Sequence, residues 1–438
     1  MVPHLDGIHE GCAKLAERLI RCSAQVAGKK YDVKVLEGRR ENHLKVFYLD
    51  HPSLKSPLAL TSDSGITACA LFAHAVCDWL KQVPVAYDIV QCDGLCTALI
   101  PALLKTLHKD DVRLASLKAV VALPGIEDKA CIDMAWIRKI GLPNAVGTSE
   151  KMEFYGKLSI LKGVYLYADA IVVPHAHIKE NIEKNRGKDI GMEGVLFQKM
   201  NALHEVAIGS DLKKCDPNTD PVLEANYDAD KINGKNKCKA ALTQKLHIKK
   251  DRPLVAFIGK LNRDSGIDLV NDILDDLMDR QVSFIIAGEG SDAYQNAVDG
   301  WQDEFKGCVA WMKGKPSFDN VRKILSAADV LLIPSKSENF GRLHQIAMKY
   351  GCVVVARNQG CAAHDIQPVV DLEKINPSDN GFLFDRYDSD QFFDATMDAL
   401  DVYATPAWND IRANAMKLDA SIVNTADACA KLYRELKL

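Results

Sequence analysis

The chain has 438 residues, of which 47% are hydrophobic and 26% are charged, a composition typical of globular proteins and a length too great for one ordinary core. Its net charge of −4 excludes the basic footprint of a nucleic-acid-binding protein, and no apolar run reaches the roughly 18 residues that a membrane span needs. The 13 cysteines include no CxxC pair, so we expect no metal site, and thiols scattered through apolar segments indicate a reducing cytosol.

The first half of the sequence alternates predicted strands with predicted helices. Apolar residues at helical spacing (Cys12, Leu15 and Leu19) predict a helix over residues 10–23. Strands are predicted at 32–36, 45–49, 88–91, 119–123 and 171–173. Further helices are predicted at 62–80, with Ser62 or Asp63 as the cap, from about 97, and at 150–168. This alternation predicts a parallel, doubly wound sheet.

The second half restarts the alternation after a polar segment, residues 201–251, which we interpret as the join between two domains. Strands are predicted at 254–258, 282–287, 330–333 and 352–356. Helices are predicted at 267–278, up to about 350, after Asp388 as a cap, and at 426–436 after Thr425 as a cap. The last helix has nothing left in sequence to pair with, so we expect it to pack back across the domain boundary. The sequence therefore predicts two Rossmann-like halves with a cleft between them.

Two loops predict a site for a small molecule that carries phosphates. Residues 334–341 follow one predicted strand and residues 359–361 follow the next. Ligands of open parallel sheets bind beyond the carboxyl ends of the strands, where both loops lie. The turn at residues 288–290 (Gly-Glu-Gly) is too short for a dinucleotide fingerprint. It is either a plain strand-end turn or a turn that approaches a nucleoside.

Several motifs resemble those of the bacterial glycogen synthases and plant starch synthases. The most specific is residues 209–211 (Gly-Ser-Asp) followed by residues 216–221 (DPNTDP) and Tyr227, since no general fold requires this pattern. Residues 334–341 (PSKSENFG) are similar to the family's PSRFEPCG loop. The remaining matches lie at residues 167–170, 347–351, 380–382 and 432–436.

The resemblance implies the GT-B fold, in which two Rossmann-like domains face a cleft and a C-terminal helix crosses back. It divides the chain into an acceptor-side domain over 1–205, a nucleotide-sugar-side domain over 206–404 and crossing helices over 405–438. It implies a retaining glycosyltransferase that moves a sugar from a nucleotide sugar, such as ADP-glucose, to a glucan or other glycan, without a cofactor. The family's first strand would lie before Met1 and so is missing from this sequence: either the true start lies upstream, or another strand fills the gap, or the first domain is remodelled.

The resemblance also implies the site. It gives catalytic roles to Glu338, which contacts the sugar, and to Lys260, which stands where the family has an arginine that binds the diphosphate. The leaving diphosphate develops negative charge, which cations stabilise. The residues expected to bind the donor are Gly7, Arg263, Glu289, Phe340, Gly341, Arg342, Gln359, Gly360 and Cys361. The two catalytic candidates each have a plainer alternative: Glu338 could be a solvated loop carboxylate, and Lys260 could be a surface lysine. His344, where the family has glutamine, is either a polar contact or helix surface.

Five family side chains are replaced, at His4, Gly94, Pro124, Ile208 and Ser265. Ser265 stands where the family has a second cation, so Arg263 or Arg342 would have to supply it, and lysine at 260 lacks the bidentate fork of arginine. The sequence therefore leaves two hypotheses. The first is a glycogen/starch synthase-like transferase with weak activity on ADP-glucose. The alternative is an inactive relative that binds a glucan, a nucleotide or a protein partner. Under both hypotheses the N-terminal residues show no signal-peptide pattern, so the predicted location is the cytoplasm, or a plastid stroma after processing.

Overall fold

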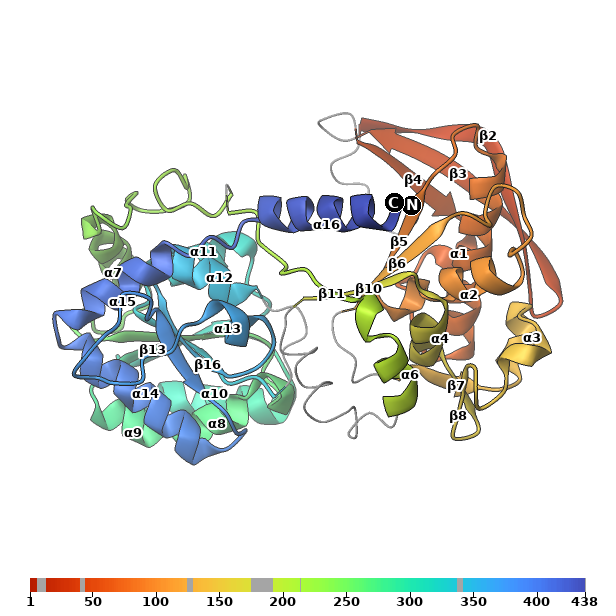
Figure 1. Ribbon diagram of the computed structural model, residues 1–438. Coiled ribbons are helices and arrows are strands. Elements are labelled where there is room, and N and C mark those ends of the chain that lie inside the picture. The colour runs from red at the N-terminus through yellow and green to blue at the C-terminus, as the bar shows by residue number, and fades with distance from the viewer. Residues whose placement is uncertain are drawn as a thin grey trace. The chain divides into compact units, whose positions relative to one another are not determined.

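The computed structural model describes residues 1–5, 13–39, 44–123, 129–174, 192–212, 214–336 and 342–437. The chain forms two compact units (Figure 1). Unit 1 consists of Met1–Val206 together with Ala428–Leu438, and unit 2 consists of Ala207–Asp427. No helix among the described residues has both the length and the apolar character that crossing a membrane would require.

Unit 1 contains three sheets. The first has the order β1 (Val2–Pro3), β4 (Lys45–Asp50), β3 (Lys29–Arg39) and β2 (Ala13–Val26), with only the β1–β4 pair parallel. The second is fully parallel, with the order β11 (Leu203–Glu205), β10 (Ala170–Val173), β6 (Lys118–Ala122) and β5 (Ile89–Asp93). The third is a small antiparallel sheet of β7 (Cys131–Asp133), β9 (Lys157–Ser159) and β8 (Glu153–Phe154). The strand β1 lies at the edge of the first sheet and not in the parallel one, so the expectation about the family's first strand stays a prediction.

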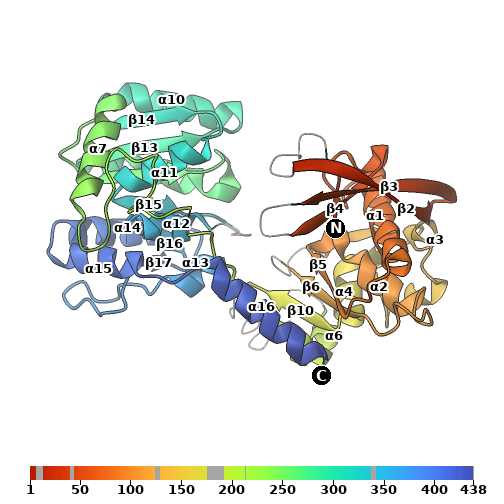
Figure 2. The same ribbon diagram turned by 90° about the horizontal axis from the view of Figure 1, so that it is seen from above.

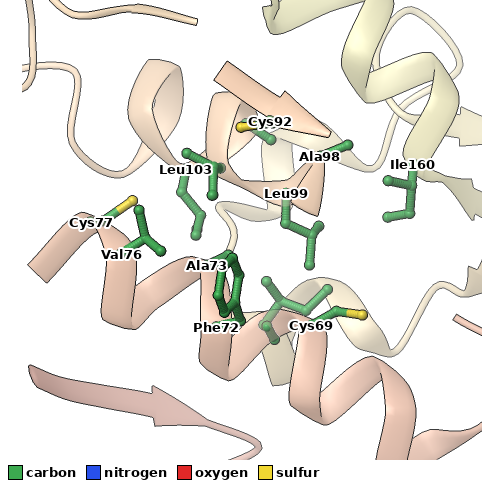
Figure 3. Packing of buried hydrophobic residues seen from close by; sticks show 14 of the residues in the cluster. Cys69, Phe72, Ala73, Val76, Cys77, Cys92, Ala98, Leu99, Leu103 and Ile160 are labelled. Atoms are coloured by element: carbon green, nitrogen blue, oxygen red, sulfur yellow. The ribbon is translucent and has the colours of Figure 1, made fainter. Parts of the chain in front are cut away.

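The core of unit 1 lies around α1 (Asp63–Gln82), which Ser62 caps through a hydrogen bond to the Gly65 amide. Figure 3 shows Phe72 and Ala73 of α1 turned toward Leu99 and Leu103 of α2. The other described helices of the unit are α2 (Leu99–Thr106), α3 (Trp136–Ile140), α4 (Ile160–Tyr167) and α6 (Glu193–Gln198). Single 3-10 turns lie at Pro52–Leu54, Leu95–Thr97, Asn144–Val146 and Met200–Ala202.

Unit 2 is built on a six-stranded parallel sheet, and Figure 2 shows its strands in order from β14 to β17. The order is β14 (Val309–Lys313), β13 (Ser283–Gly288), β12 (Leu254–Ile258), β15 (Val330–Ile333), β16 (Val353–Arg357) and β17 (Gly381–Phe384). In chain order the strands read third, second, first, fourth, fifth, sixth, which is the doubly wound Rossmann arrangement. The direction of winding therefore reverses between β12 and β15.

Helices cover both faces of this sheet, because successive strand residues point to opposite sides. Val255 and Phe257 belong to one apolar cluster, and Leu254 and Ala256 belong to the other. The described helices are α7 (Asn233–Lys245), α8 (Ile267–Asp272), α9 (Leu274–Asp279), α10 (Asp292–Glu304), α11 (Phe318–Ala327), α12 (Leu343–Lys349), α13 (Gly360–Asp365), α14 (Ser389–Tyr403) and α15 (Ala407–Met416), with a 3-10 turn at Arg263–Ser265.

The last helix, α16 (Ile422–Lys437), begins in unit 2 and ends in unit 1. Leu432 is buried in a cluster with Val120, Ala170, Val172 and Val206. The expected packing of the final helix is confirmed, but the helix begins earlier than predicted. Thr425 is not its cap: the Thr425 hydroxyl accepts from the Gly209 amide and donates to the Ala207 carbonyl oxygen.

Three predicted helices are wrong or incomplete. Residues 13–26 form strand β2 rather than a helix. Residues 150–168 contain the hairpin β8–β9 and only the short helix α4. The segment 267–278 breaks into α8 and α9 at Ile273. The strands predicted at 32–36, 45–49, 88–91, 119–123, 171–173, 254–258, 282–287, 330–333 and 352–356 are all present.

Candidate functional site

The loops after β12 and β13 are joined by their backbones. The Gly259 amide donates to Ala287 O at 3.0 Å, and the Leu261 amide donates to Glu289 O at 2.8 Å. Position 288 needs glycine, because a Cβ there would lie 1.8 Å from the Gly259 carbonyl oxygen. The backbone of the turn at residues 288–290 therefore supports the loop that carries Lys260.

The loop after β15 contacts the loop after β12, which carries Lys260, across the switch point. Gly266 has a φ of +80°, and a Cβ there would lie 2.3 Å from the carbonyl oxygen of Pro334. The Lys336 amide donates to Asp264 O at 2.8 Å. The two loops that flank the switch point are thus held together without side chains, at the edge where parallel sheets bind ligands.

The loop after β16 completes this arrangement. Gln359 Nε2 donates to Ser335 O at 2.8 Å, and Arg357 Nη1 donates to Lys336 O at 2.5 Å. Gly360 and Cys361 are buried and begin α13, and Gly360 has a φ of +61°. We call the four loops, residues 259–266, 288–290, 334–336 and 357–361, the donor ledge. Arg357 was missed in the sequence, although an arginine that ends a buried strand beside such a loop is a usable signal.

The cations of the ledge differ in how they are engaged. Lys260 is exposed, and no ion-pair partner for its ammonium occurs among the described residues. Arg263 lies with its Nε 3.3 Å from Asp268 Oδ2. The Tyr387 hydroxyl, also missed in the sequence, lies 2.6 Å from both Arg263 O and Asp268 Oδ1. Glu289 is exposed, and its backbone rather than its carboxylate has a structural role here.

Arg342 is exposed, and its Nη1 donates to Gly209 O at 2.6 Å, a bond that positions one end of the guanidinium without neutralising its charge. The neighbouring His344 is fully buried, so it is not helix surface, and its Nε2 lies 2.7 Å from Asp365 Oδ2. Gln345 Nε2 donates to the same carboxylate oxygen at 2.8 Å and to Ile208 O at 3.0 Å. Burial opposes the ionised form of Asp365, but the hydrogen bonds from His344 and Gln345 outweigh it and lower its pKa.

In unit 1, the histidine that replaces the family's first lysine, His4, already has hydrogen-bond partners. His4 is buried, with its Nδ1 2.7 Å from Asp50 Oδ1 and 2.9 Å from Lys55 Nζ. Lys55 Nζ also donates to Asp50 Oδ1 at 2.6 Å. Burial disfavours the ionised form of Asp50, yet the bonds from Lys55 and His4 give a net lowering of its pKa.

Four of the expected site residues lie outside the described part of the chain: Gly7, Glu338, Phe340 and Gly341. The roles that the resemblance implies for them therefore stay predictions. The structure brings together Lys260, Arg263 and Glu289 with Gln359, Gly360 and Cys361 along the donor ledge.

Comparison with known proteins agrees with this architecture. The family model of the starch synthase catalytic domain matches residues 1–198, and the model of glycosyl transferases group 1 matches residues 239–417. A glycogen synthase of Thermosipho melanesiensis is 30% identical over 83% of this chain and 76% of its own length. Glycogen synthase 2 of Geobacter sulfurreducens is 29% identical over 83% of this chain and 75% of its own length.

A solved structure shares the fold. The catalytic domain of starch synthase IV from Arabidopsis thaliana, bound to ADP and acarbose, superposes with a TM-score of 0.88 at 22% identity, over 99% of this chain and 91% of that one. Together with the parallel sheets and the donor ledge, these matches show that the chain belongs to the glycogen and starch synthase family of glycosyltransferases.

Proposed function

We propose that the protein transfers a glycosyl group from a nucleoside-diphosphate sugar to a glucan, and that unit 2 binds the donor on the donor ledge. One observation carries the proposal: four loops at the carboxyl ends of β12, β13, β15 and β16 are joined around the switch point, the first three by backbone contacts and the last by the side chains of Gln359 and Arg357, which donate to carbonyl oxygens. Backbone donors and a fixed loop geometry survive the replacement of side chains, and they are what a phosphate-binding loop needs.

The chemistry assigns the roles. The bond between the sugar C1 and the diphosphate oxygen breaks, its electron pair leaves on that oxygen, and the acceptor hydroxyl forms the new bond to C1 and gives its proton to the departing diphosphate. Lys260 is the exposed cation placed to stabilise the charge on the leaving group, with the amides of Gly360 and Cys361. Glu338 would orient the sugar, as its match to the family loop implies. The ADP bound by the starch synthase IV relative supports a nucleoside diphosphate as the leaving group.

The weakened charge of the ledge predicts a slow enzyme with ADP-glucose. Ser265 replaces a family cation, and Lys260 replaces an arginine that could bind two phosphate oxygens at once. Loss of one such electrostatic contact typically costs about 10²–10³ in rate. We therefore expect donor binding to be retained more fully than turnover.

A second candidate function, a non-catalytic binding scaffold, is favoured by a specific observation. The two basic side chains that could compensate for the lost cation have other partners: Arg263 Nε lies 3.3 Å from Asp268 Oδ2, and Arg342 Nη1 donates to Gly209 O. On this alternative the donor ledge would bind a nucleotide, or nothing, while the protein acts through a glucan or a protein partner.

Calorimetric titration separates the two. The purified chain is titrated with ADP, UDP, GDP, ADP-glucose and UDP-glucose. We expect one of these nucleotides to bind, Lys260→Ala to weaken it roughly tenfold or more, and Ser265→Lys to strengthen it by a similar factor, because each change removes or adds one charge-assisted contact. Lys250→Ala is the matched control, since Lys250 is an exposed lysine that precedes β12 and so lies at the opposite end of the strand.

Each outcome decides something. Binding that depends on Lys260, together with glucan elongation that is lost in Glu338→Gln, supports the transferase. Binding without any elongation supports the scaffold. If no nucleotide binds at millimolar concentration while the protein remains folded by circular dichroism, the donor ledge has lost its ligand and the transferase proposal is wrong.

A further inference from the structure

A second site lies in unit 2, away from the donor ledge. A half-open cavity of about 230 Å³ is lined by α7, α11, β14 and the segment that follows Pro221. Helices α7 and α11 pack against each other. No residue of the donor ledge lines the cavity, so it is a separate feature. One of its walls belongs to the polar segment that carries the most specific sequence motif of the chain, to which the proposed transferase reaction assigns no role.

Part of the cavity lining is apolar. It consists of Leu223, Leu242, Leu246 and Met312 together with Cys238, and we call it the apolar floor. The α7 residues 238, 241, 242 and 245 follow one another three and four apart, so they lie on one face of the helix. This surface is ready to bury the apolar part of a ligand.

The cavity wall is rigid because α7 is anchored from inside. The ammonium of Lys235, which is 3% exposed, donates to Leu325 O at 3.1 Å, Ser326 O at 3.3 Å and Tyr350 O at 3.0 Å. These bonds attach α7 to the carboxyl ends of α11 and α12. Pockets that bind small molecules are usually preformed in this way.

The polar groups of the lining have the character of an anion site. Lys245, Lys323 and Asn320 line the cavity, and none of their side chains has a hydrogen-bond or ion-pair partner within the described ranges. The one carboxylate of the lining is Glu224. Two unpaired ammonium groups against one carboxylate give the lining a net positive charge beside an apolar floor.

The same lining argues against the ligands of the donor ledge. No aromatic side chain lines the cavity, so a nucleobase would find no ring to stack on. A sugar ring lying on the apolar floor would bury some of its hydroxyl groups against carbon, a cost that an alkyl chain does not have.

We propose that this cavity binds a small organic monoanion, a medium-chain carboxylate whose apolar chain lies on the floor and whose carboxylate contacts Lys245, Lys323 and Asn320. The apolar chain supplies affinity through burial, and the two ammonium groups select the sign of the head group. This proposal does not depend on whether the donor ledge binds a nucleotide.

Titration of the full chain with octanoate tests it, with octylammonium and 1-octanol as probes of equal chain length and different head group. We expect octanoate to bind at one site, octanol more weakly, and octylammonium not at all. Lys245→Gln combined with Lys323→Gln should weaken octanoate roughly tenfold, since two charge-assisted contacts are lost, and should leave octanol unchanged. Lys237→Gln is the matched control, because this exposed lysine of α7 does not line the cavity.

Ala241→Trp provides the second test, because a large side chain at this half-buried rim position fills the cavity without entering the core. It should abolish the binding of both octanoate and octanol, while the circular dichroism spectrum is preserved. Octanoate binding that persists in Ala241→Trp, equal binding of octylammonium, or no octanoate binding at millimolar concentration would each overturn the proposal.

Discussion

Lys235 and Lys239 lie one turn apart on α7 and are placed in opposite electrostatic surroundings. Lys235 contacts three carbonyl oxygens and no carboxylate, and burial lowers its pKa from the ordinary 10.5 to about 8. Lys239 is also desolvated, which lowers its pKa, but Asp329 Oδ2 lies 2.7 Å away and the net effect is a raised pKa. The two residues therefore make opposite predictions for stability against pH.

Between pH 8 and 10.5 the unfolded chain binds more protons at Lys235 than the folded chain does. The free energy of unfolding of the native protein should therefore rise with pH relative to Lys235→Met, by up to about 1.4 kcal/mol per pH unit. The raised pKa of Lys239 gives the opposite sign: its contribution is complete below 10.5 and is lost only as the pH rises through its folded value. Urea denaturation at several pH values from neutral to about 10 measures the contribution of Lys235 and should show none from Lys239. Stability curves that stay parallel for native protein and Lys235→Met would contradict the lowered pKa.

At the scale of the element, the errors in reading the sequence have physical causes. Leu15 and Leu19 are four apart, a spacing that satisfies the period of a helix and that of a strand alike. In β2 the strand period appears only at Cys22, Ala24 and Val26, which are buried, because two register shifts interrupt the first part of the strand. A helix is therefore the natural but wrong reading of the first part.

The second error came from an overlooked turn. Tyr155 and Gly156 have φ values of +47° and +77° and connect β8 to β9 as a two-residue hairpin loop. Tyr is a rare residue at such a position, so the sequence offers only the glycine as a signal. By contrast the caps Ser62 and Asp388 were predicted and are confirmed, because a side-chain oxygen before an apolar helical stripe is a local signal.

The candidate site was predictable to the same extent. The positions of the loops at residues 334–341 and 359–361 follow from strand order, whereas Lys260 follows only from the resemblance to the family motif, and the roles of these residues stay predictions. The direction of Arg342 was not predictable, because its acceptor, Gly209 O, lies 133 residues away in sequence. A long guanidinium selects among acceptors that only the folded chain brings near.

The contact between the loops after β12 and β15 gives a prediction for this scale. Gly266→Ala adds a Cβ 2.3 Å from Pro334 O at a φ of +80°, whereas Gly314→Ala adds one in open space at a φ of +91°. Both variants should lose about 1–2 kcal/mol of unfolding free energy, because a residue with a Cβ is strained at a positive φ. Gly266→Ala should lose about a further 1–3 kcal/mol of unfolding free energy, because the two loops must move apart. Denaturation with guanidinium compares them, and an equal loss in both variants would show that the close approach of the loops costs nothing.

At the scale of the whole molecule, each unit has its own core, but unit 1 is assembled from two separate stretches of chain. Its last part, the end of α16, covers the apolar face formed by Val120, Ala170 and Val172. Stability of unit 1 thus depends on residues that follow unit 2 in sequence.

Leu432→Ala should therefore destabilise unit 1 by about 2–5 kcal/mol, the usual cost of removing a buried leucine side chain. Hydrogen exchange should accelerate in β6 and β10 and stay unchanged in β12 and β13. Ile422→Ala is the control, because Ile422 is 44% exposed on the same helix. Equal acceleration in both units would mean that they unfold as one body.

Because unit 1 consists of two separate stretches of chain, it cannot be completed until its last stretch has left the ribosome. Residues 1–206 leave the ribosome first, but the segment that closes their parallel sheet, residues 428–438, emerges only after the whole of unit 2. At roughly 5–20 residues per second, this delay lasts about ten to forty seconds. During that interval the apolar face of the sheet lacks its cover, and a chaperone or another nascent chain can reach it. Loss of the final residues at that stage would leave a nearly full-length polypeptide that exposes this apolar face. Exposed apolar surface is what cellular quality control recognises.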